Sequence, residues 1–235
     1  MTARWEHMKV DGREVRIYVS VPDHDRPRAG IVIAHHGPGL DAAMLDIVHR
    51  LTRAGYAAAL PDLFHRIPAE VTDMMARIGR LRDDELVIDM RAAAAHLQSR
   101  SPRVGPLGVT GFCMGGRVTY LMAAADPQFE AAAVFYGGGM LARWGEQPSP
   151  FERSADIGRP LIGFFGVEDS NPSIDDVRRI DAELTRLSKW HEFHVYQGAG
   201  HAFMNFTNAE RYRHRPAQAA WGELVAFFDE FLAPR

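Results

Sequence analysis

The sequence predicts an α/β fold with an open, mostly parallel sheet and helices on both faces. Short apolar runs such as residues 30–34 and 107–112 are typical of parallel strands that are buried on both sides. Segments with apolar residues at helical spacing separate these runs, and this alternation favours a parallel sheet. The chain has 235 residues, of which 46% are hydrophobic and 24% charged, so we expect one globular domain over residues 1–235.

The first half of the chain predicts four strands and two helices. Apolar and polar residues alternate over 15–21, which predicts a half-buried edge strand, and buried strands follow at 30–34, 56–63 and 107–112. Asp41 can cap a first helix that Gly55 ends, and a second helix is predicted over 83–98. Residues 64–82 are poorly patterned and are a candidate cover for a pocket.

The second half repeats the same alternation. Helices are predicted over 114–125, 175–187 and 216–232, with strands over 131–139, 160–166 and 191–196. Ligands of such sheets bind beyond the carboxyl ends of the strands. We therefore expect the functional residues in the turns that lead from strands to helices.

Composition excludes several classes of protein. The chain has 27 Lys and Arg against 30 Asp and Glu, so its net charge of −3 does not favour nucleic acid or anionic lipid. Cys113 is the single cysteine, which excludes an intrachain disulfide and a zinc site built on several thiolates. The sequence contains neither a signal-peptide-like run near residue 1 nor a membrane-spanning run, so we expect a cytoplasmic protein.

The most informative turn is the segment GFCMGG, residues 111–116. A predicted strand ends in glycine, Cys113 follows, and two glycines open the next helix, as in the nucleophile elbow G-x-S-x-G with cysteine replacing serine. The helix amino terminus favours a thiolate at Cys113. A small buried cysteine at an ordinary tight turn is the alternative, and the flanking glycines favour the nucleophile.

A base and an acid follow in the order of the α/β-hydrolase arrangement. His201 lies in the turn after the predicted strand 191–196, where a loop can deliver its imidazole. Asp169 follows the strand 160–166 at the same edge of the sheet, and Glu168 is its main competitor for the acid position. Cys113, Asp169 and His201 are therefore the candidate catalytic triad.

The turn after the strand 30–34 is the third candidate element. Two backbone N–H groups, those of Met114 and Gly37, are the candidate oxyanion donors. Adjacent histidines of a strand point to opposite faces, so we interpret His35 and His36 as one core residue and one pocket residue. A metal site using these histidines lacks a supporting carboxylate cluster or HExxH motif, and we expect neither a metal nor a cofactor.

These segments together resemble the dienelactone hydrolase family of α/β hydrolases. The resemblance includes IVIAHHGPGL, GYAAALPDLFHR, GFCMGG, FYGGG, GVEDSNPS and GAGHAF, and so extends over nearly the whole chain. It implies an α/β-hydrolase fold and hydrolysis of a small ester or lactone by Cys113, His201 and Asp169 through a thioester, without a cofactor. It also implies a monomer.

Two pocket positions depart from the family. Where the family has a glutamate that holds the thiol, this sequence has His36, which we expect to favour the thiolate. Where the family has an arginine that binds the substrate carboxylate, this sequence has the uncharged Asn205. A neutral or differently shaped ester is therefore expected, unless one of Arg66, Arg77, Arg80 and Arg82 replaces the missing charge.

A non-hydrolytic member of the same fold is the competing hypothesis. Such a protein would bind a small molecule or use Cys113 as a thiol redox sensor, because fold alone does not determine function. The separate placement of nucleophile, acid and base at three strand ends favours catalysis.

Overall fold

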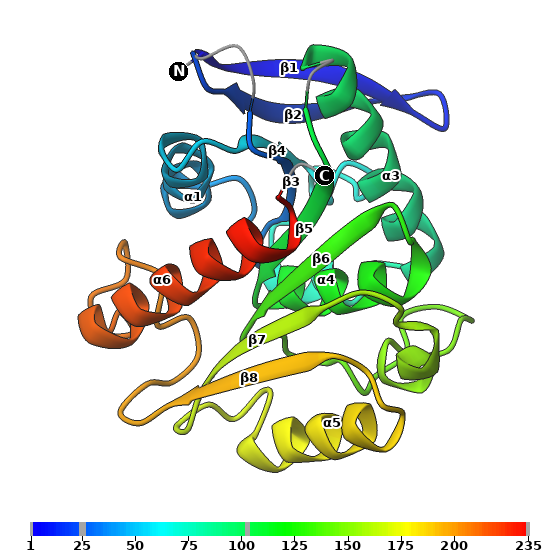
Figure 1. Ribbon diagram of the computed structural model, residues 1–235. Helices are drawn as coiled ribbons and strands as arrows, with labels where there is room; N and C mark the ends of the chain where they lie inside the picture. Colours follow the sequence, from blue (N-terminus) through cyan, green and yellow to red (C-terminus); the bar gives the residue numbers. More distant parts are fainter. Residues whose placement is uncertain (1, 24–26, 102–103, 234–235) are drawn as a thin grey trace.

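The computed structural model describes residues 2–23, 27–101 and 104–233. Within these ranges the chain forms one eight-stranded sheet in the order β1-β2-β4-β3-β5-β6-β7-β8 (Figure 1). Strands β3 to β8 are parallel, and β2 is antiparallel to both β1 and β4. The strands are β1 Thr2–Val10, β2 Arg13–Val21, β3 Gly30–Ala34, β4 Ala57–Pro61, β5 Leu107–Phe112, β6 Phe129–Phe135, β7 Leu161–Gly166 and β8 His191–Tyr196.

Helices cover both faces of this sheet, as the sequence predicts. One face packs against α1 and α6, and the other against α3, α4 and α5 (Figure 1). The helices are α1 Ala42–Arg53, α2 Met74–Ile78, α3 Asp83–Arg100, α4 Met114–Ala125, α5 Ile174–Arg186 and α6 His214–Phe231, with a 3₁₀ helix η1 at Phe151–Asp156. Asp41 caps α1 as predicted, because its side chain accepts a hydrogen bond from the N–H of Met44.

The prediction that the strand beginning near Val15 forms the edge of the sheet was wrong. Strand β1 lies outside it and pairs with β2 along its full length, from Thr2 opposite Val21 to Val10 opposite Arg13. The alternation that marks a strand is weak in β1, because Met8 and Val10 are its only buried residues. Charged side chains along an edge strand discourage pairing with another chain and obscure the strand in the sequence.

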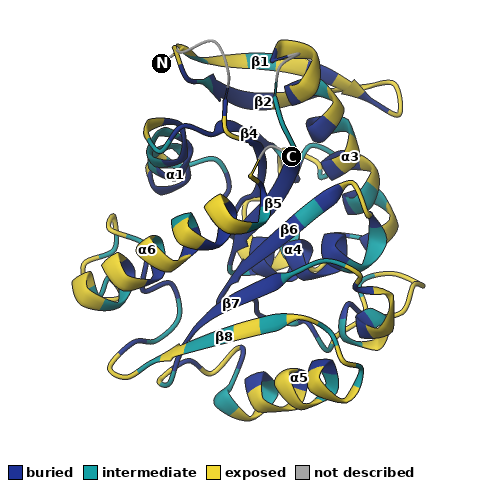
Figure 2. Cartoon of the chain, viewed as in Figure 1, coloured by how far each residue is buried: buried dark blue, intermediate teal, exposed yellow. Residues whose placement is uncertain are grey.

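The central strands are buried on both faces (Figure 2). Helix α4 lies so close to them that side chains have no room at two glycines. A Cβ on Gly111 would lie 2.1 Å from the carbonyl oxygen of Gly115, and a Cβ on Gly115 would lie 2.1 Å from that of Ala34. This close contact fixes the turn between β5 and α4, which carries Cys113. None of the described helices is long and apolar enough to cross a membrane.

Candidate active site

Cys113 lies at the tight turn between β5 and α4, as the sequence predicts. Its backbone has φ 58° and ψ −120°, an unfavourable conformation for a residue with a Cβ. The N–H of Cys113 is held by the carbonyl oxygen of Phe135, and its own carbonyl oxygen accepts the N–H of Gly116. The residue is half-buried.

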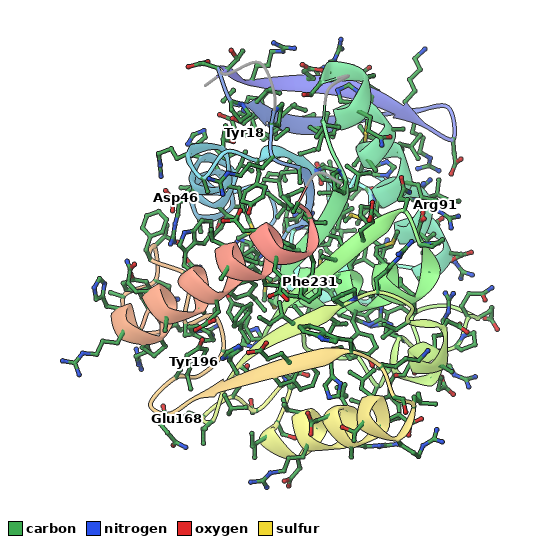
Figure 3. The ribbon with its side chains drawn as sticks, in the orientation of Figure 1. Tyr18, Asp46, Arg91, Glu168, Tyr196 and Phe231 are labelled. Carbon is green, nitrogen blue, oxygen red and sulfur yellow. The ribbon has the colours of Figure 1, made fainter. Side chains whose placement is uncertain are left out.

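The structure brings His201 and Asp169 together beside this thiol. The Nδ1 of His201 lies 2.8 Å from Oδ2 of Asp169, so Nδ1–H donates to the carboxylate. The other carboxylate oxygen accepts the N–H of Asn171 at 2.8 Å, which fixes the acid. Glu168 is exposed on the surface beyond the end of β7 (Figure 3), so the partner of His201 is Asp169.

The electrostatics of these groups favour a thiolate and an imidazolium. Burial raises the pKa of Cys113, but hydrogen bonding and charge interaction with His201 and hydrogen bonds from the N–H groups of Met114 and Gly37 lower it overall. Burial lowers the pKa of His201, and the opposing hydrogen bonds to Asp169 and Cys113 raise it to about 10. Both shifts favour the thiolate–imidazolium pair over the neutral thiol and imidazole.

The two candidate oxyanion donors both lower the pKa of the Cys113 thiol. The N–H groups of Met114 and Gly37 both interact with the side chain of Cys113, although they come from the first turn of α4 and the loop after β3. Helix α2 lies close to this loop, because a Cβ on Gly37 would lie 2.7 Å from the Sδ atom of Met74. The poorly patterned stretch thus places α2 over the oxyanion loop.

His35 and His36 are both buried, and only His36 lines the narrow cavity described below. His35 is fully buried, its Nδ1 lies 2.7 Å from the carbonyl oxygen of His36, and its Nε2 accepts the N–H of Leu63 at 3.1 Å. Burial lowers the pKa of His35 to about 4, so it is neutral at pH 7. His36 places Nε2 2.8 Å from Oδ2 of Asp41. The lowered pKa of Cys113 arises from His201 and the two N–H groups, and no contribution of His36 is needed.

A narrow cavity with room for about one water molecule lies beside Phe112 at the end of β5, and we call it the side cavity. It contains both predicted pocket residues, His36 and Asn205, although Oδ1 of Asn205 is engaged by the N–H and hydroxyl of Thr207 at 3.0 and 2.6 Å. The remaining described lining is mostly apolar and comes from α1, the ends of β5 and β6, and the loop after His201. These side chains are Ala43, Met44, Ile47, Phe112, Tyr136, Met204 and Phe206.

The motifs in the sequence did not point to Tyr136, whose ring contacts the imidazole of His201. Its ring packs edge-on against the imidazole of His201, with centroids 5.3 Å apart, and against Phe203 at the same distance. Its φ is 37°, and three of the five non-glycine residues with positive φ in the described chain are Cys113, Tyr136 and Ala202. The signal available in the sequence was its position directly after a buried strand, at the same sheet edge as Cys113.

The part of the chain that the structure describes contains no cluster of side chains suited to a metal ion. Among the residues it describes, no group of three or more His, Cys, Asp and Glu side chains is arranged to hold an ion. His191 and His194 instead lie near single carboxylates, at 3.1 Å from Asp181 and 2.9 Å from Glu192.

A sheet of this topology with helices on both faces is the α/β-hydrolase fold, and comparison with known proteins identifies the family. Residues 15–232 match the model of the dienelactone hydrolase family, and the chain belongs to that family. A protein of Synechocystis provisionally named carboxymethylenebutenolidase is 31% identical over 207 residues, which cover 83% of this chain and 82% of that protein.

Two further relatives agree with this assignment. A protein of Methylorubrum extorquens with the same provisional name is 28% identical over 225 residues, which cover 91% of this chain and 76% of that protein. The crystal structure of a provisionally named dienelactone hydrolase from Klebsiella pneumoniae is similar with a TM-score of 0.91 and 26% identity, covering 98% of this chain and 99% of that one. The family assignment supports a hydrolase of the ester or lactone type.

Proposed function

We propose that the protein hydrolyses a carboxylic ester or lactone, with Cys113 as nucleophile, His201 as acid and base, and Asp169 as the group that orients His201. The observation that carries this proposal is the set of groups that act on one thiol. His201 and the backbone N–H groups of Met114 and Gly37 lower the pKa of Cys113, and Asp169 holds His201 through its Nδ1. A nucleophile, a base held by an acid and paired oxyanion donors are the parts that acyl transfer requires.

In the first half of the reaction, the Cys113 thiolate attacks the acyl carbon and forms a C–S bond, while the carbonyl electrons move to oxygen. The N–H groups of Met114 and Gly37, which interact with the sulfur in the free protein, then stabilise the oxyanion. Collapse of this intermediate breaks the C–O bond, and the leaving alkoxide takes the proton from His201. The acyl group remains on Cys113 as a thioester.

In the second half, His201 removes a proton from water, which attacks the thioester. The second tetrahedral intermediate collapses with cleavage of the C–S bond, and the carboxylic acid product leaves. Asp169 stabilises the imidazolium in both halves and keeps Nδ1 protonated. The thiolate and the imidazolium are then restored.

A panel of neutral and carboxylated esters and lactones, assayed with the wild type and Cys113→Ala, tests this proposal. We expect Cys113→Ala to reduce kcat/KM by about a thousandfold or more, because triad members act as a unit. Activity within about tenfold of the wild type would show that Cys113 is not the nucleophile. A small-molecule binder would turn over no member of the panel, and a redox sensor would form a sulfenic acid under peroxide without turnover.

A further inference from the structure

His201 lies on a long connection whose position no regular element fixes. Residues 197–213 join β8 to α6 (Figure 1), and this described segment, which we call the His201 loop, forms neither helix nor strand. Ala202, directly after the histidine, has φ 63°, a conformation that residues with a Cβ seldom adopt unless their surroundings impose it. The position of the imidazole therefore depends on the contacts that hold the loop.

One residue holds the His201 loop on both sides of the histidine. The Nε–H of Arg213 donates to the carbonyl oxygen of Gly198 at 3.1 Å, and the backbone N–H of Arg213 donates to that of Phe203 at 3.0 Å. Gly198 precedes His201 by three residues, and Phe203 follows it by two. The side chain and the backbone of Arg213 thus tie together the two ends of the segment that carries the base.

The guanidinium of Arg213 is itself fixed in place. Its Nη1 donates to the carbonyl oxygens of Glu210 at 2.6 Å and of Tyr212 at 3.1 Å. The hydrogen bonds described for this side chain all go to backbone carbonyl oxygens of the His201 loop. The group therefore orders the backbone of the loop.

The stability of α6 does not explain an arginine at this position. Arg213 is the N-cap residue of α6, and its side chain makes no capping hydrogen bond. Aspartate, asparagine, serine and threonine are the usual capping residues, and a cation at this end of a helix opposes the helix dipole. What the arginine provides is its contact with the His201 loop.

We propose that Arg213 is a positioning residue for His201, and that its side-chain hydrogen bond to Gly198 keeps the imidazole in place beside the thiol. This inference rests on the proposed hydrolase function. The Nδ1 of His201 lies 2.8 Å from Oδ2 of Asp169, so a displacement of about 1 Å would break this hydrogen bond. Arg213 acts through the backbone of the loop and takes no part in the bond-making steps.

Two neutral variants of similar length isolate the Nε–H group of Arg213. Arg213→Gln places an amide N–H at the position of Nε, whereas Arg213→Met places a methyl group there. Both variants lack the positive charge, so a difference between them reports the hydrogen bond to Gly198. Arg215→Met, at an exposed position in the first turn of α6, is the matched control for loss of charge at this end of the helix.

The kinetic test uses p-nitrophenyl acetate. We expect Arg213→Met to lower kcat by about tenfold or more and to leave KM within about twofold, because a displaced His201 slows acyl transfer and not substrate binding. Arg213→Gln and Arg215→Met should keep kcat within about threefold of the wild type. Rescue by glutamine distinguishes the hydrogen bond from the charge.

The alkylation of Cys113 by iodoacetamide gives a second readout that does not depend on turnover. The pH midpoint of alkylation should move upward in Arg213→Met, because the imidazolium would no longer be held beside the thiol. The midpoint should stay at the wild-type value in Arg213→Gln and Arg215→Met. A mere loss of stability would leave the midpoint of the folded protein unchanged.

The outcomes separate this inference from the proposed function. If the wild type turns over the ester no faster than Cys113→Ala, the hydrolase function fails, and the alkylation midpoints still test the position of the imidazole. With an active wild type, the role of Arg213 is overturned if Arg213→Met loses no more kcat than Arg215→Met, or raises KM alone. It is also overturned if the alkylation midpoint does not move, or if Arg213→Gln loses as much kcat as Arg213→Met. Should Arg213→Met not fold, a loss above about threefold in Arg213→Gln overturns it.

Discussion

The chemistry of Cys113 depends on neighbours that lie far away in the sequence. Its turn is marked locally by glycines, but the groups that lower its pKa include His201 and the N–H of Gly37, 88 and 76 residues distant. Cysteine in this setting is expected to exist as a thiolate at a pH where an ordinary thiol is protonated.

The first prediction concerns this ionisation. The pKa of Cys113 is lowered, so its alkylation by iodoacetamide should reach half its maximal rate below about pH 8.5, the ordinary thiol value. His201→Ala removes the cation and should move the midpoint upward. Alkylation that rises only near pH 8.5 in both proteins would contradict the ion pair.

The second prediction concerns the acid. Asp169→Asn can donate its amide to Nδ1 and thereby stabilise the wrong imidazole tautomer, so kcat should fall by about 10³–10⁴ with little change in KM. Steady-state kinetics measure this effect. Glu168→Gln, one residue away and exposed, is the control and should stay within about twofold; a similar loss in both variants would point to a general disturbance of the loop.

At the residue scale, the sequence identified the groups that meet at the thiol but not all of their partners. Cys113, Asp169, His201, Met114 and Gly37 were predicted from motifs at strand ends, and the structure brings them together. The pairing of His36 with Asp41 was missed, because Asp41 was already explained as a helix cap. Asp41 does both: its Oδ1 atom caps α1, and its Oδ2 atom lies next to His36.

Helix α4 is the element that determines where the thiol lies. Its first turn packs directly on the backbone of β3 and β5. Gly111 and Gly115 are therefore needed because a Cβ at either position would collide with backbone atoms. This kind of contact explains why the boundaries of β5 and α4 were predicted correctly, since glycine marks both sides of the turn.

The third prediction compares two helical glycines. Gly115→Ala would place a Cβ 2.1 Å from the carbonyl oxygen of Ala34, so we expect a loss of about 3 kcal/mol or more in the free energy of unfolding. Gly222→Ala in α6 meets nothing within 4 Å and should gain about 0.5–1 kcal/mol from helix propensity. Urea denaturation measures both, and a Gly115→Ala protein as stable as the wild type would refute the close contact.

Elements with a strong internal pattern were predicted well, and β1 and α2, which have few or no buried residues, were not. The buried strands β3 and β7 and the amphipathic helices α1 and α5 have clear apolar spacing. Strand β1 and helix α2 have few or no buried residues, so no hydrophobic period reveals them. Local signals remain, since Asp73 caps α2 and the turn of Asp11 and Gly12, both with positive φ, joins β1 to β2.

At the scale of the whole molecule, one buried ion pair connects regions that frame the site. The guanidinium of Arg117 in α4 donates to both oxygens of Asp83 at the start of α3, and to the carbonyl oxygens of Gly139 and Ala142 at 3.0 and 2.7 Å. It also lies 3.8 Å from the centre of the Trp144 ring. The loop after β6, which begins with Tyr136, is thereby held against α3 and α4.

The fourth prediction follows from this burial. Asp83→Ala leaves the fully buried Arg117 without its carboxylate, so the free energy of unfolding should fall by about 3–5 kcal/mol. Asp84→Ala removes a half-exposed carboxylate near Arg82 and should change it by less than about 0.5 kcal/mol. If Asp83→Ala and Asp84→Ala changed the free energy of unfolding equally, in calorimetry or urea denaturation, the buried ion pair would not stabilise the fold.

The fold class was predictable because alternating strands and helices admit few topologies. The right-handed crossover rule and the burial of parallel strands reduce the choices before any coordinates are known. The buried ion pair of Arg117 and Asp83 was not predictable. Charged residues on a helix are usually exposed to solvent, and nothing in the sequence indicates that these two are buried.

The central claim is that the acyl group of the substrate is transferred to Cys113. Rapid quenching during turnover of a p-nitrophenyl ester, followed by intact and peptide mass spectrometry, measures this transfer directly. We predict a burst of p-nitrophenol and an acyl adduct on the peptide that contains Cys113, both absent in Cys113→Ala. Steady turnover with an unmodified Cys113 peptide, or with the adduct on another residue, would contradict the account.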